Sequence, residues 1–214
     1  MGVNMAGNCI CNDEICKEAS RQEIVRRYYA ALNGILKGTC PEEQAQTIEL
    51  LMNQAGVTIQ DRKVVSAALK RAEKTNAPAA ALELPDGTMI TGKTGNLLGA
   101  SAALLLNVLK HLAGLEHELH IISPEAIEPI QKLKVEYLKS KNPRLHTDEV
   151  LIALSTSAAS NPDARLALRQ LDKLEGCQAH TSVILSDVDI KIFQKLGVQL
   201  TCEPVYEDGD VYHR

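Results

Sequence analysis

The chain has few aromatic residues and no tryptophan. Among its 214 residues, Phe, Trp and Tyr make up 3%, and Phe193 is the one phenylalanine. This leaves little aromatic surface for stacking on bases, so the core must be built from Leu, Ile, Val and Ala. The net charge is −4 and no basic patch stands out. We therefore expect no nucleic-acid partner.

The sequence also lacks a long apolar run. The longest, residues 97–106, is interrupted by Gly99 and Ser101 and is too short to span a bilayer. The first residues, MGVNMAGNCICNDE, are acidic rather than basic and contain no long apolar stretch, which argues against a signal peptide. We expect a cytoplasmic protein that has no membrane partner.

Cysteine and histidine do not show the spacing of a metal site. Cys9, Cys11 and Cys16 cluster near the start, but the chain has no C-x-x-C pair, which is the usual spacing of two thiolate ligands to one zinc ion. His117 and His120 would point to opposite faces of a strand and could not bind one ion. We expect no metal site, and cysteines that stay reduced.

The first third of the chain is periodic in the manner of helices. Apolar residues recur at spacings of three and four in residues 13–37, and Gly38 ends that segment. A second stripe precedes Gly56, and a third runs through residues 61–74. We expect residues 1–77 to form an N-terminal helical subdomain.

From residue 78 onward the periodicity changes. Residues 79–84 and 88–91 flank Pro-Asp-Gly at 85–87, which predicts a β-hairpin. Residues 97–112 are apolar almost all round and predict a buried helix. Strands expected at residues 117–122, 181–185 and 198–202 alternate with helices. This order predicts an α/β protein in which residues 78–214 form a three-layer α/β/α sandwich with a mixed sheet.

A hairpin followed by a buried helix also suits a deaminase-like topology. That class of enzyme needs a His or Cys with a catalytic Glu on the helix, and a later P-C-x-x-C motif. The buried helix offers Thr94, Asn96 and Ser101 instead, and the later motif is absent from the sequence. The serine motif G-x-S-x-G is absent too, because the second glycine is missing after Ser101.

Residues 87–94, GTMITGKT, match the phosphate-loop pattern G-x-x-x-x-G-K-[ST]. A working phosphate loop needs its strand to end before the first glycine. Here Gly87 belongs to the expected hairpin turn, and the residues that follow it favour a strand. We therefore interpret the match as a turn, and not as a nucleotide-hydrolase motif.

Residues 91–96 lead directly into the expected buried helix and form a first candidate ligand site. Free N–H groups at a helix start favour an anion, Lys93 adds charge, and Thr94 and Asn96 add donors. Small residues near the helix start, Ser101 among them, leave room for close approach. The alternative is that Thr94 or Asn96 only caps a core helix. The candidate ligand residues here are Gly92, Lys93, Thr94, Asn96 and Ser101.

A second candidate lies at residues 141–149, KNPRLHTDE. His146 could act as a general acid or base and Arg144 could bind an oxyanion or a phosphate. Asn142 and Asp148 would complete the ligand contacts. The alternative is a solvated connection in which Thr147 or Asp148 caps a helix.

Several segments resemble the bacterial family called domain of unknown function 1846. They are MGVNMAG at 1–7, ELPDGTMITGKT at 83–94, LLGASAALLLNVLKHLAG at 97–114, SPEAIEPIQKLK at 123–134, NPRLHTDEVLIALS at 142–155 and TCEPVY at 201–206. The resemblance implies a helical subdomain followed by a sandwich of deaminase-like topology. Full-length members are more than twice this long. The resemblance therefore implies that this chain corresponds to the family's C-terminal portion, lacks its N-terminal region, and is a fragment or a split-gene product.

These observations predict a small anionic ligand, a nucleotide or phosphorylated metabolite, bound between residues 91–96 and 142–149. Lys93 and Arg144 would hold the anion, Thr94 and Asn96 would orient it, and His146 would move a proton in any chemistry. The sequence leaves the cofactor unknown and leaves open whether the chain is an enzyme. The alternative is a structural module that forms a homo-oligomer through the helical subdomain and the apolar helix at 97–112.

Overall fold

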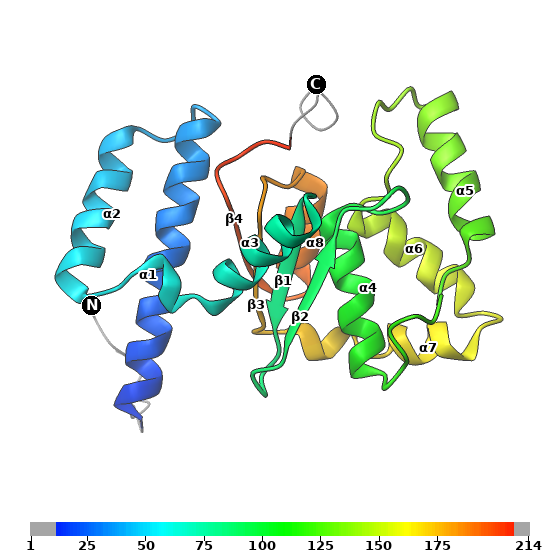
Figure 1. Ribbon diagram of the computed structural model, residues 1–214, viewed down its shortest axis with the longest axis horizontal. Helices are drawn as coiled ribbons and strands as arrows, with labels where there is room; N and C mark the ends of the chain where they lie inside the picture. The colour runs from blue at the N-terminus through cyan, green and yellow to red at the C-terminus, as the bar shows by residue number, and fades with distance from the viewer. Residues whose placement is uncertain (1–11, 208–214) are drawn as a thin grey trace. The chain divides into compact units, whose positions relative to one another are not determined.

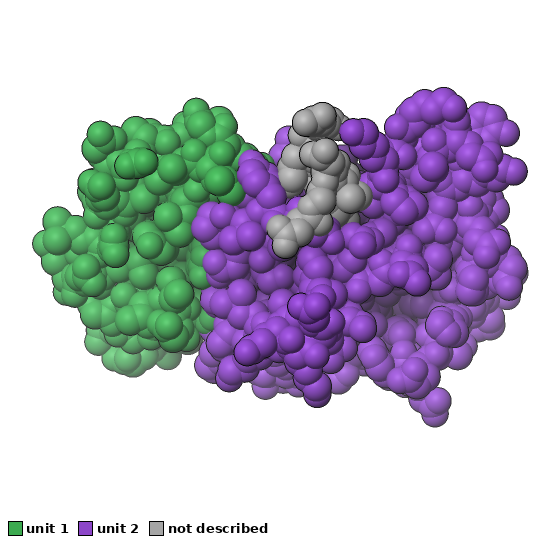
Figure 2. Space-filling model, turned by 45° about the horizontal axis from the view of Figure 1, so that its top comes forward, with its two compact units in different colours: residues 1–62 green, residues 63–214 purple. Residues whose placement is uncertain are grey.

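The computed structural model describes residues 12–207, which divide into two compact units, residues 1–62 and 63–214 (Figures 1 and 2). The described residues form helices together with one four-stranded mixed sheet, so the expected α/β class is confirmed. Helix α3 lies with the second unit, so the compact units divide earlier than the expected domain boundary at residues 77 and 78. Whether the chain divides into independently folding domains at residues 77 and 78 stays a prediction.

The first unit contains helices α1 (Asp13–Leu36) and α2 (Glu42–Ala55), which pack against each other, and the 3₁₀ turn η1 (Ile59–Asp61). Helix α1 begins after Asn12, whose side-chain oxygen accepts from the backbone N–H groups of Glu14 and Ile15. Helix α2 ends at Gly56, which has a left-handed φ of 61° that glycine adopts without strain. Both expected helices in this part of the chain are confirmed.

The second unit is built on a sheet with the strand order β2-β1-β3-β4. Strand β1 (Ala79–Glu83) pairs antiparallel with both β2 (Met89–Lys93) and β3 (Gln178–Thr181), and β3 pairs parallel with β4 (Gln199–Cys202). The remaining elements of this unit are α3 (Lys63–Thr75), α4 (Ala100–Leu112), α5 (Pro124–Lys132), the π-helix η2 (Leu133–Tyr137), α6 (Thr147–Ser157), α7 (Pro162–Leu168), η3 (Leu171–Leu174) and α8 (Asp187–Lys195).

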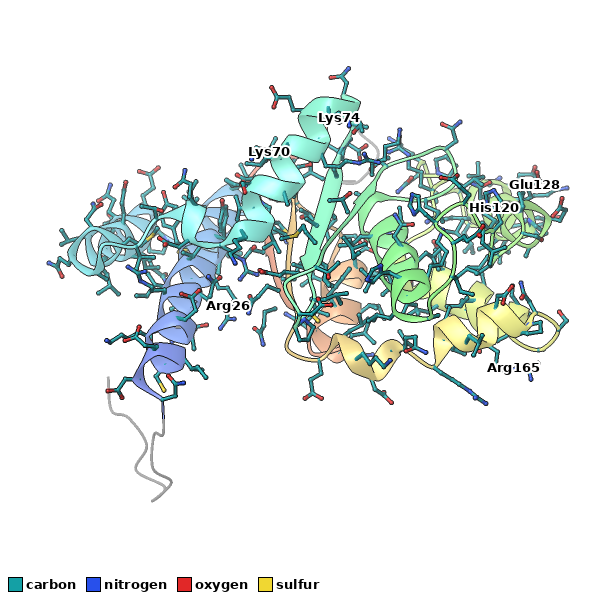
Figure 3. All side chains as sticks on the ribbon, turned by 60° about the horizontal axis from the view of Figure 1, so that its bottom comes forward. Arg26, Lys70, Lys74, His120, Glu128 and Arg165 are labelled. Carbon is teal, nitrogen blue, oxygen red and sulfur yellow. The ribbon has the colours of Figure 1, made fainter. Side chains whose placement is uncertain are left out.

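Helices cover both faces of this sheet. Ala81 packs with Val64 and Ala68 of α3 on one face, and Lys70 and Lys74 of α3 are exposed (Figure 3). On the other face, Ala80 and Leu82 join the main core. That core also contains Leu104, Leu105 and Val108 of α4 and buried residues of α6, α7 and α8. The core is almost entirely aliphatic, as the shortage of aromatic residues predicts.

The hairpin is confirmed and accounts for the apparent phosphate loop. Gly87 has a φ of 84°, and its N–H donates to the Leu84 carbonyl across the turn. Of the four residues that would have to wrap a phosphate, Met89, Ile90 and Thr91 lie in strand β2 and pair with β1. A strand cannot turn several consecutive N–H groups toward one anion, so residues 87–94 do not form a phosphate loop.

Three sequence expectations differ from the structure. The strand expected at residues 181–185 is found at Gln178–Thr181 instead, and residues 182–185 are not part of a strand. Residues 117–122 form bends and turns rather than a strand, although Ile121 and Ile122 are buried in the core. The apolar helix begins at Ala100 rather than at residue 97, because residues 97–99 pair with another loop. Among residues 12–207, no helix has both the length and the hydrophobicity needed to cross a membrane.

Candidate functional site

The second unit contains a cleft of about 710 Å³. Its walls come from α3, residues 76–78, residues 94–96, Arg144, residues 182–183 and residues 205–207. The volume lies in the range of about 300–1,000 Å³ that small-molecule sites occupy. Residues 94–96 and Arg144 belong to the two loops that the sequence singled out, so part of each loop opens onto one cleft.

Short backbone contacts hold these two loops together. Leu98 and Leu145 form an isolated parallel bridge, in which the Leu145 N–H donates to the Leu97 carbonyl at 2.9 Å. The Gln131 side-chain amide of α5 donates to the Pro143 carbonyl at 3.0 Å and to the Asn96 carbonyl at 3.5 Å. The loops are therefore fixed to each other through main-chain atoms.

The predicted residues of the first loop occupy different environments. Thr94 is buried, its N–H donates to the Pro78 carbonyl at 2.7 Å, and it lines the cleft together with Asn96. Lys93 is exposed at the end of β2 and is not among the described residues that line the cleft. Ser101 is buried in the first turn of α4, and Gly92 lies inside β2.

Gly92 has a packing role that the sequence did not reveal. A Cβ atom at this position would lie 2.2 Å from the backbone nitrogen of Leu104 and 2.6 Å from its Cα. Helix α4 therefore approaches β2 more closely than any residue other than glycine allows. This close packing accounts for the glycine at position 92 without a ligand.

In the second loop, Asn142 and Asp148 shape the backbone. Asn142 is buried, and its Oδ1 accepts from the Arg144 N–H at 3.0 Å. Its Nδ2 has no hydrogen-bond partner among the described residues. Asp148 accepts from the Glu149 N–H at 2.8 Å in the first turn of α6. Arg144 reaches the segment after β4, where its Nη1 lies 2.7 Å from Glu207 Oε1.

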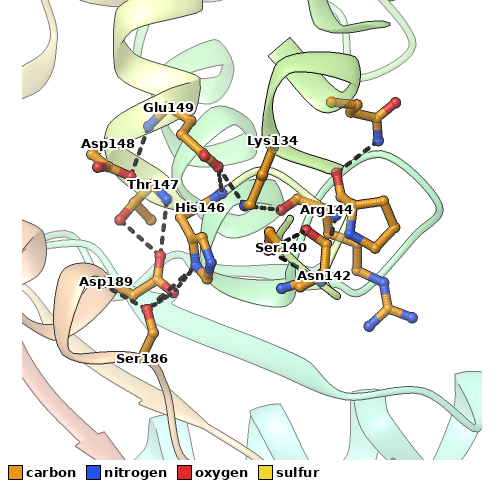
Figure 4. Close-up of polar contacts among 12 residues, drawn as sticks. Lys134, Ser140, Asn142, Arg144, His146, Thr147, Asp148, Glu149, Ser186 and Asp189 are labelled. Carbon is orange, nitrogen blue, oxygen red and sulfur yellow. Dashed lines mark hydrogen bonds and ion pairs between the residues drawn. The ribbon is translucent and has the colours of Figure 1, made fainter. Parts of the chain in front are cut away.

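A buried lysine supports this loop from the π-helix η2. Lys134 Nζ donates to the Arg144 carbonyl at 2.6 Å and to Glu149 Oε2 at 2.7 Å (Figure 4). The same Glu149 oxygen accepts from the His146 N–H at 2.7 Å. The ammonium group thus joins the two ends of the segment that carries Arg144 and His146.

The His146 ring faces a buried carboxylate from α8 (Figure 4). His146 Nδ1 lies 3.0 Å from Asp189 Oδ2, and Ser186 Oγ donates to the same oxygen at 2.8 Å. The other oxygen, Oδ1, accepts from both the N–H and the hydroxyl of Thr147, each at 2.9 Å. An imidazole oriented by a carboxylate in this way is suited to general acid–base chemistry.

The hydrogen bonds around Asp189 favour its charged form. Burial is the largest influence and raises the pKa, but it is outweighed by the hydrogen bond and charge of His146 and by donors from Thr147 and Ser186. Together they hold the pKa of Asp189 below its ordinary value of 3.8. The carboxylate is therefore ionised at neutral pH and can only accept hydrogen bonds.

Some of the residues considered for a metal site lie outside the part of the chain that the structure describes. Cys9 and Cys11 lie outside the described residues, and Cys16 is exposed in α1. Within residues 12–207, no group of three or more His, Cys, Asp and Glu side chains is placed to hold an ion.

Three contributors to the site were missed from the sequence. Asp189 is 43 residues from His146, and Lys134 and Glu207 are also distant from the residues they contact. The only local signal was Ser186-x-x-Asp189, a pattern typical of a helix N-terminus. Ser186 Oγ does accept from the Asp189 N–H at 3.2 Å, but that pattern says nothing about a histidine partner.

Comparison with known proteins gives a consistent result along the chain. Residues 1–56 match the family description "Domain of unknown function DUF1846, N-terminal" and residues 60–212 match "Domain of unknown function DUF1846, C-terminal". A UPF0371 protein of Corynebacterium urealyticum is 55% identical over 214 residues, which cover 100% of this chain and 43% of that protein. A UPF0371 protein of Streptococcus uberis is 49% identical over 214 residues, which cover 100% of this chain and 43% of that protein.

The chain thus spans less than half the length of these curated relatives. The expectation that it corresponds only to the C-terminal portion of the family and lacks the N-terminal region is wrong, because residues 1–56 match the N-terminal domain. The resemblance to the family itself is confirmed over both domains. The chain belongs to the family described as domain of unknown function DUF1846.

Proposed function

We propose that the cleft of the second unit binds a small anionic ligand, a nucleotide or phosphorylated metabolite, as part of an enzyme. The observation that carries this proposal is that Thr94, Asn96 and Arg144 line one cleft. Arg144 is the anion-binding residue, because a guanidinium forms paired hydrogen bonds with phosphate and carboxylate oxygens. Thr94 and Asn96 orient the ligand.

A further observation supports a ligand in this region. The guanidinium of Arg144 already has a carboxylate, Glu207, at 2.7 Å, so its position is compatible with an anionic oxygen.

The proposal is tested by the thermal stability of the whole chain in the presence of AMP, ATP, glucose 6-phosphate and inorganic phosphate. We expect at least one organic phosphate to raise the melting temperature. Arg144→Ala should weaken binding about tenfold or more, because a hydrogen bond to a charged group is lost. Isothermal titration calorimetry gives the ratio directly.

Arg169→Ala is the matched control, because Arg169 is exposed at the end of α7 and does not line the cleft. It should leave binding unchanged. Lys93→Ala tests the remaining predicted cation. If Lys93→Ala abolishes binding and Arg144→Ala binds like the wild type, the anion site lies at the end of β2 instead. If none of the four compounds binds the wild type, the proposal fails for this chain.

The fold also supports a finer relation, a deaminase-like topology for the second unit. The supporting features are the β1–β2 hairpin, the buried helix α4 that follows it, and a mixed sheet of order β2-β1-β3-β4. We propose this as a relation of fold and not of chemistry, since the sequence lacks the P-C-x-x-C motif. Superposition of an experimental structure on zinc deaminases would contradict it if the strand orders disagree.

A structural module that self-associates is the second candidate. The apolar side chains of α4 are buried in the core of their own unit and are not available for this role. Leu133, Tyr137 and Leu138 offer another surface, because they are 51%, 70% and 71% exposed on one short segment. Light scattering at high protein concentration decides this, and a monomeric mass would exclude it.

A further inference from the structure

The cleft of the second unit is lined by more negative than positive charge. The side chains along it that are charged at neutral pH are two carboxylates, Glu73 and Glu207, and one guanidinium, Arg144. Glu207 is already next to Arg144, whereas no basic side chain among the described residues forms an ion pair with Glu73. A phosphate alone would add to this negative charge, and a ligand that also carries a positive group would complement it.

Helix α3 presents its C-terminal end to this cleft. The helix ends at Thr75, and Glu73, Asn76 and Ala77 all line the cleft. The last carbonyl groups of a helix carry partial negative charge, which favours a cation nearby. Lys74, the basic residue of the last turn, is exposed and is not among the residues that line the cleft (Figure 3). The helix end and the Glu73 carboxylate therefore both attract positive charge.

Asn76 adds a hydrogen-bond acceptor to the same wall. It follows the last residue of α3 and has a left-handed φ of 47°. Glycine takes the left-handed position after α2, α4 and α8, at Gly56, Gly114 and Gly197. At the end of α3 the position is instead occupied by a residue whose side chain lines the cleft, and its amide oxygen can accept from an ammonium group.

We infer that Glu73 and Asn76, at the C-terminal end of α3, bind a primary ammonium group, so that the ligand of the cleft carries an amine as well as a phosphate. This inference rests on the proposed function and names the class of its ligand, a phosphorylated amine. Arg144 binds the phosphate oxygens, and Glu73 accepts charge-assisted hydrogen bonds from the ammonium group. The two charges of the ligand thus meet opposite charges in the cleft.

The test compares ligands that differ only in the amine. Aminoethyl phosphate and aminobutyl phosphate are titrated into the whole chain by calorimetry, each beside the hydroxyalkyl phosphate of the same length. The measurements are made at neutral pH, where a primary amine is protonated. Both lengths are used so that the ammonium group can reach Glu73 while the phosphate is at Arg144. In at least one pair, the amine should bind about threefold tighter or more, the effect of an exposed pair of charges.

Variants of the cleft separate the two ends of the ligand. Glu73→Gln should reduce the ratio of the two affinities to about one, because the charge that selects the amine is lost. Glu128→Gln is the matched control and should keep the wild-type ratio, because Glu128 is an exposed carboxylate of α5 outside the cleft (Figure 3). Arg144→Ala should weaken the amine and the hydroxyl compound alike. Asn76→Gly should lower the ratio by less than Glu73→Gln and keep the thermal stability, since glycine adopts a φ of 47° without strain.

Equal affinities for the amine and the hydroxyl compound in both pairs would overturn the inference and leave the proposed anion site standing. A ratio that Glu73→Gln does not change would overturn it as well, since the amine would then be selected elsewhere. If neither kind of phosphate binds, the proposed function fails, and the inference fails with it.

Discussion

At the scale of single residues, Gly92 and Gly95 lie three positions apart but differ in their surroundings. Gly92 allows α4 to lie against β2, since a Cβ atom there would meet the backbone of Leu104 at 2.2 Å. Gly95 lines the cleft, and no described atom lies within 4 Å of the position a Cβ would take. A glycine-rich segment therefore combines a packing requirement with open space for a ligand.

The two positions can be separated by substitution with alanine. Gly92→Ala should lower the free energy of unfolding by about 1–3 kcal/mol, because helix backbone rather than a flexible side chain must move. Gly95→Ala is the matched control and should change the free energy of unfolding by less than about 0.5 kcal/mol. Urea denaturation of both variants checks this, and equal effects would contradict the packing explanation.

Residue types indicated candidate side chains but not the contacts between them, and the ligand-binding role of these side chains stays a prediction. Thr94, Asn96 and Arg144 were chosen for their chemistry, and the structure places them in one cleft. Asp189 could not be chosen, because its relation to His146 depends on how α6 and α8 pack. Side chains that meet across 43 residues leave no local pattern in one sequence.

At the scale of elements, the π-helix η2 determines where the second loop is held. It contains Lys134, which is buried and donates to Glu149 and to the Arg144 carbonyl. Single π-turns are rare and occur frequently at functional sites. Here the turn brings a charged group to the loop from an otherwise exposed segment, since Leu133 and Tyr137 on either side are exposed.

Lys134→Met should lower the free energy of unfolding by about 1–3 kcal/mol, because Glu149 loses its charged partner. The effect stays below that of a fully buried pair, since 24% of the Glu149 side chain is exposed. The double variant with Glu149→Gln should lose less than the sum of the single effects. Urea denaturation of the three variants measures this coupling.

Lys132→Met is the control on the preceding turn. Lys132 and Glu136 are 3.8 Å apart, and their side chains are 62% and 58% exposed. Removing such a surface pair should change the free energy of unfolding by less than about 0.5 kcal/mol. Additive effects of Lys134→Met and Glu149→Gln would show that the buried pair does not hold the loop.

Helices with a regular spacing of apolar residues and the hairpin with clear turn residues were predicted well. Segments whose conformation depends on contacts with distant parts of the chain were not. The helices at 13–36 and 42–55 and the hairpin follow from local spacing and turn residues. Residues 117–122 have the composition of a strand, yet they form turns while Ile121 and Ile122 fill the core. Residues 97–99 have helical composition but pair with Leu145 instead.

At the scale of the whole molecule, the second unit contains every part of the proposed site. The sheet, the cleft and the His146–Asp189 pair all lie within residues 63–214. Helix α3 is part of this unit, because it packs on β1, β2 and β3 and supplies one wall of the cleft. A division at residue 77 would leave the sheet face that carries Ala81 and His180 without its helix.

Truncation tests this division. A chain of residues 63–214 should unfold in one cooperative transition and retain the ligand response of the whole chain. A chain of residues 78–214 should not unfold cooperatively, because His180, fully buried in the structure, would be exposed. Circular dichroism against urea measures both, and equal cooperativity would support the boundary expected from the sequence instead.

The pair between Arg144 and Glu207 has a consequence for affinity. Because both groups belong to one chain, the Glu207 carboxylate is present near Arg144 at an effective concentration on the order of millimolar or more. Under the proposed function, a free anion would have to compete with it, so the measured dissociation constant would exceed the intrinsic one by the inverse of the fraction of molecules in which the pair is open. The proposed site would thus contain its own competitor, which would favour ligands that bind through more than one anionic contact.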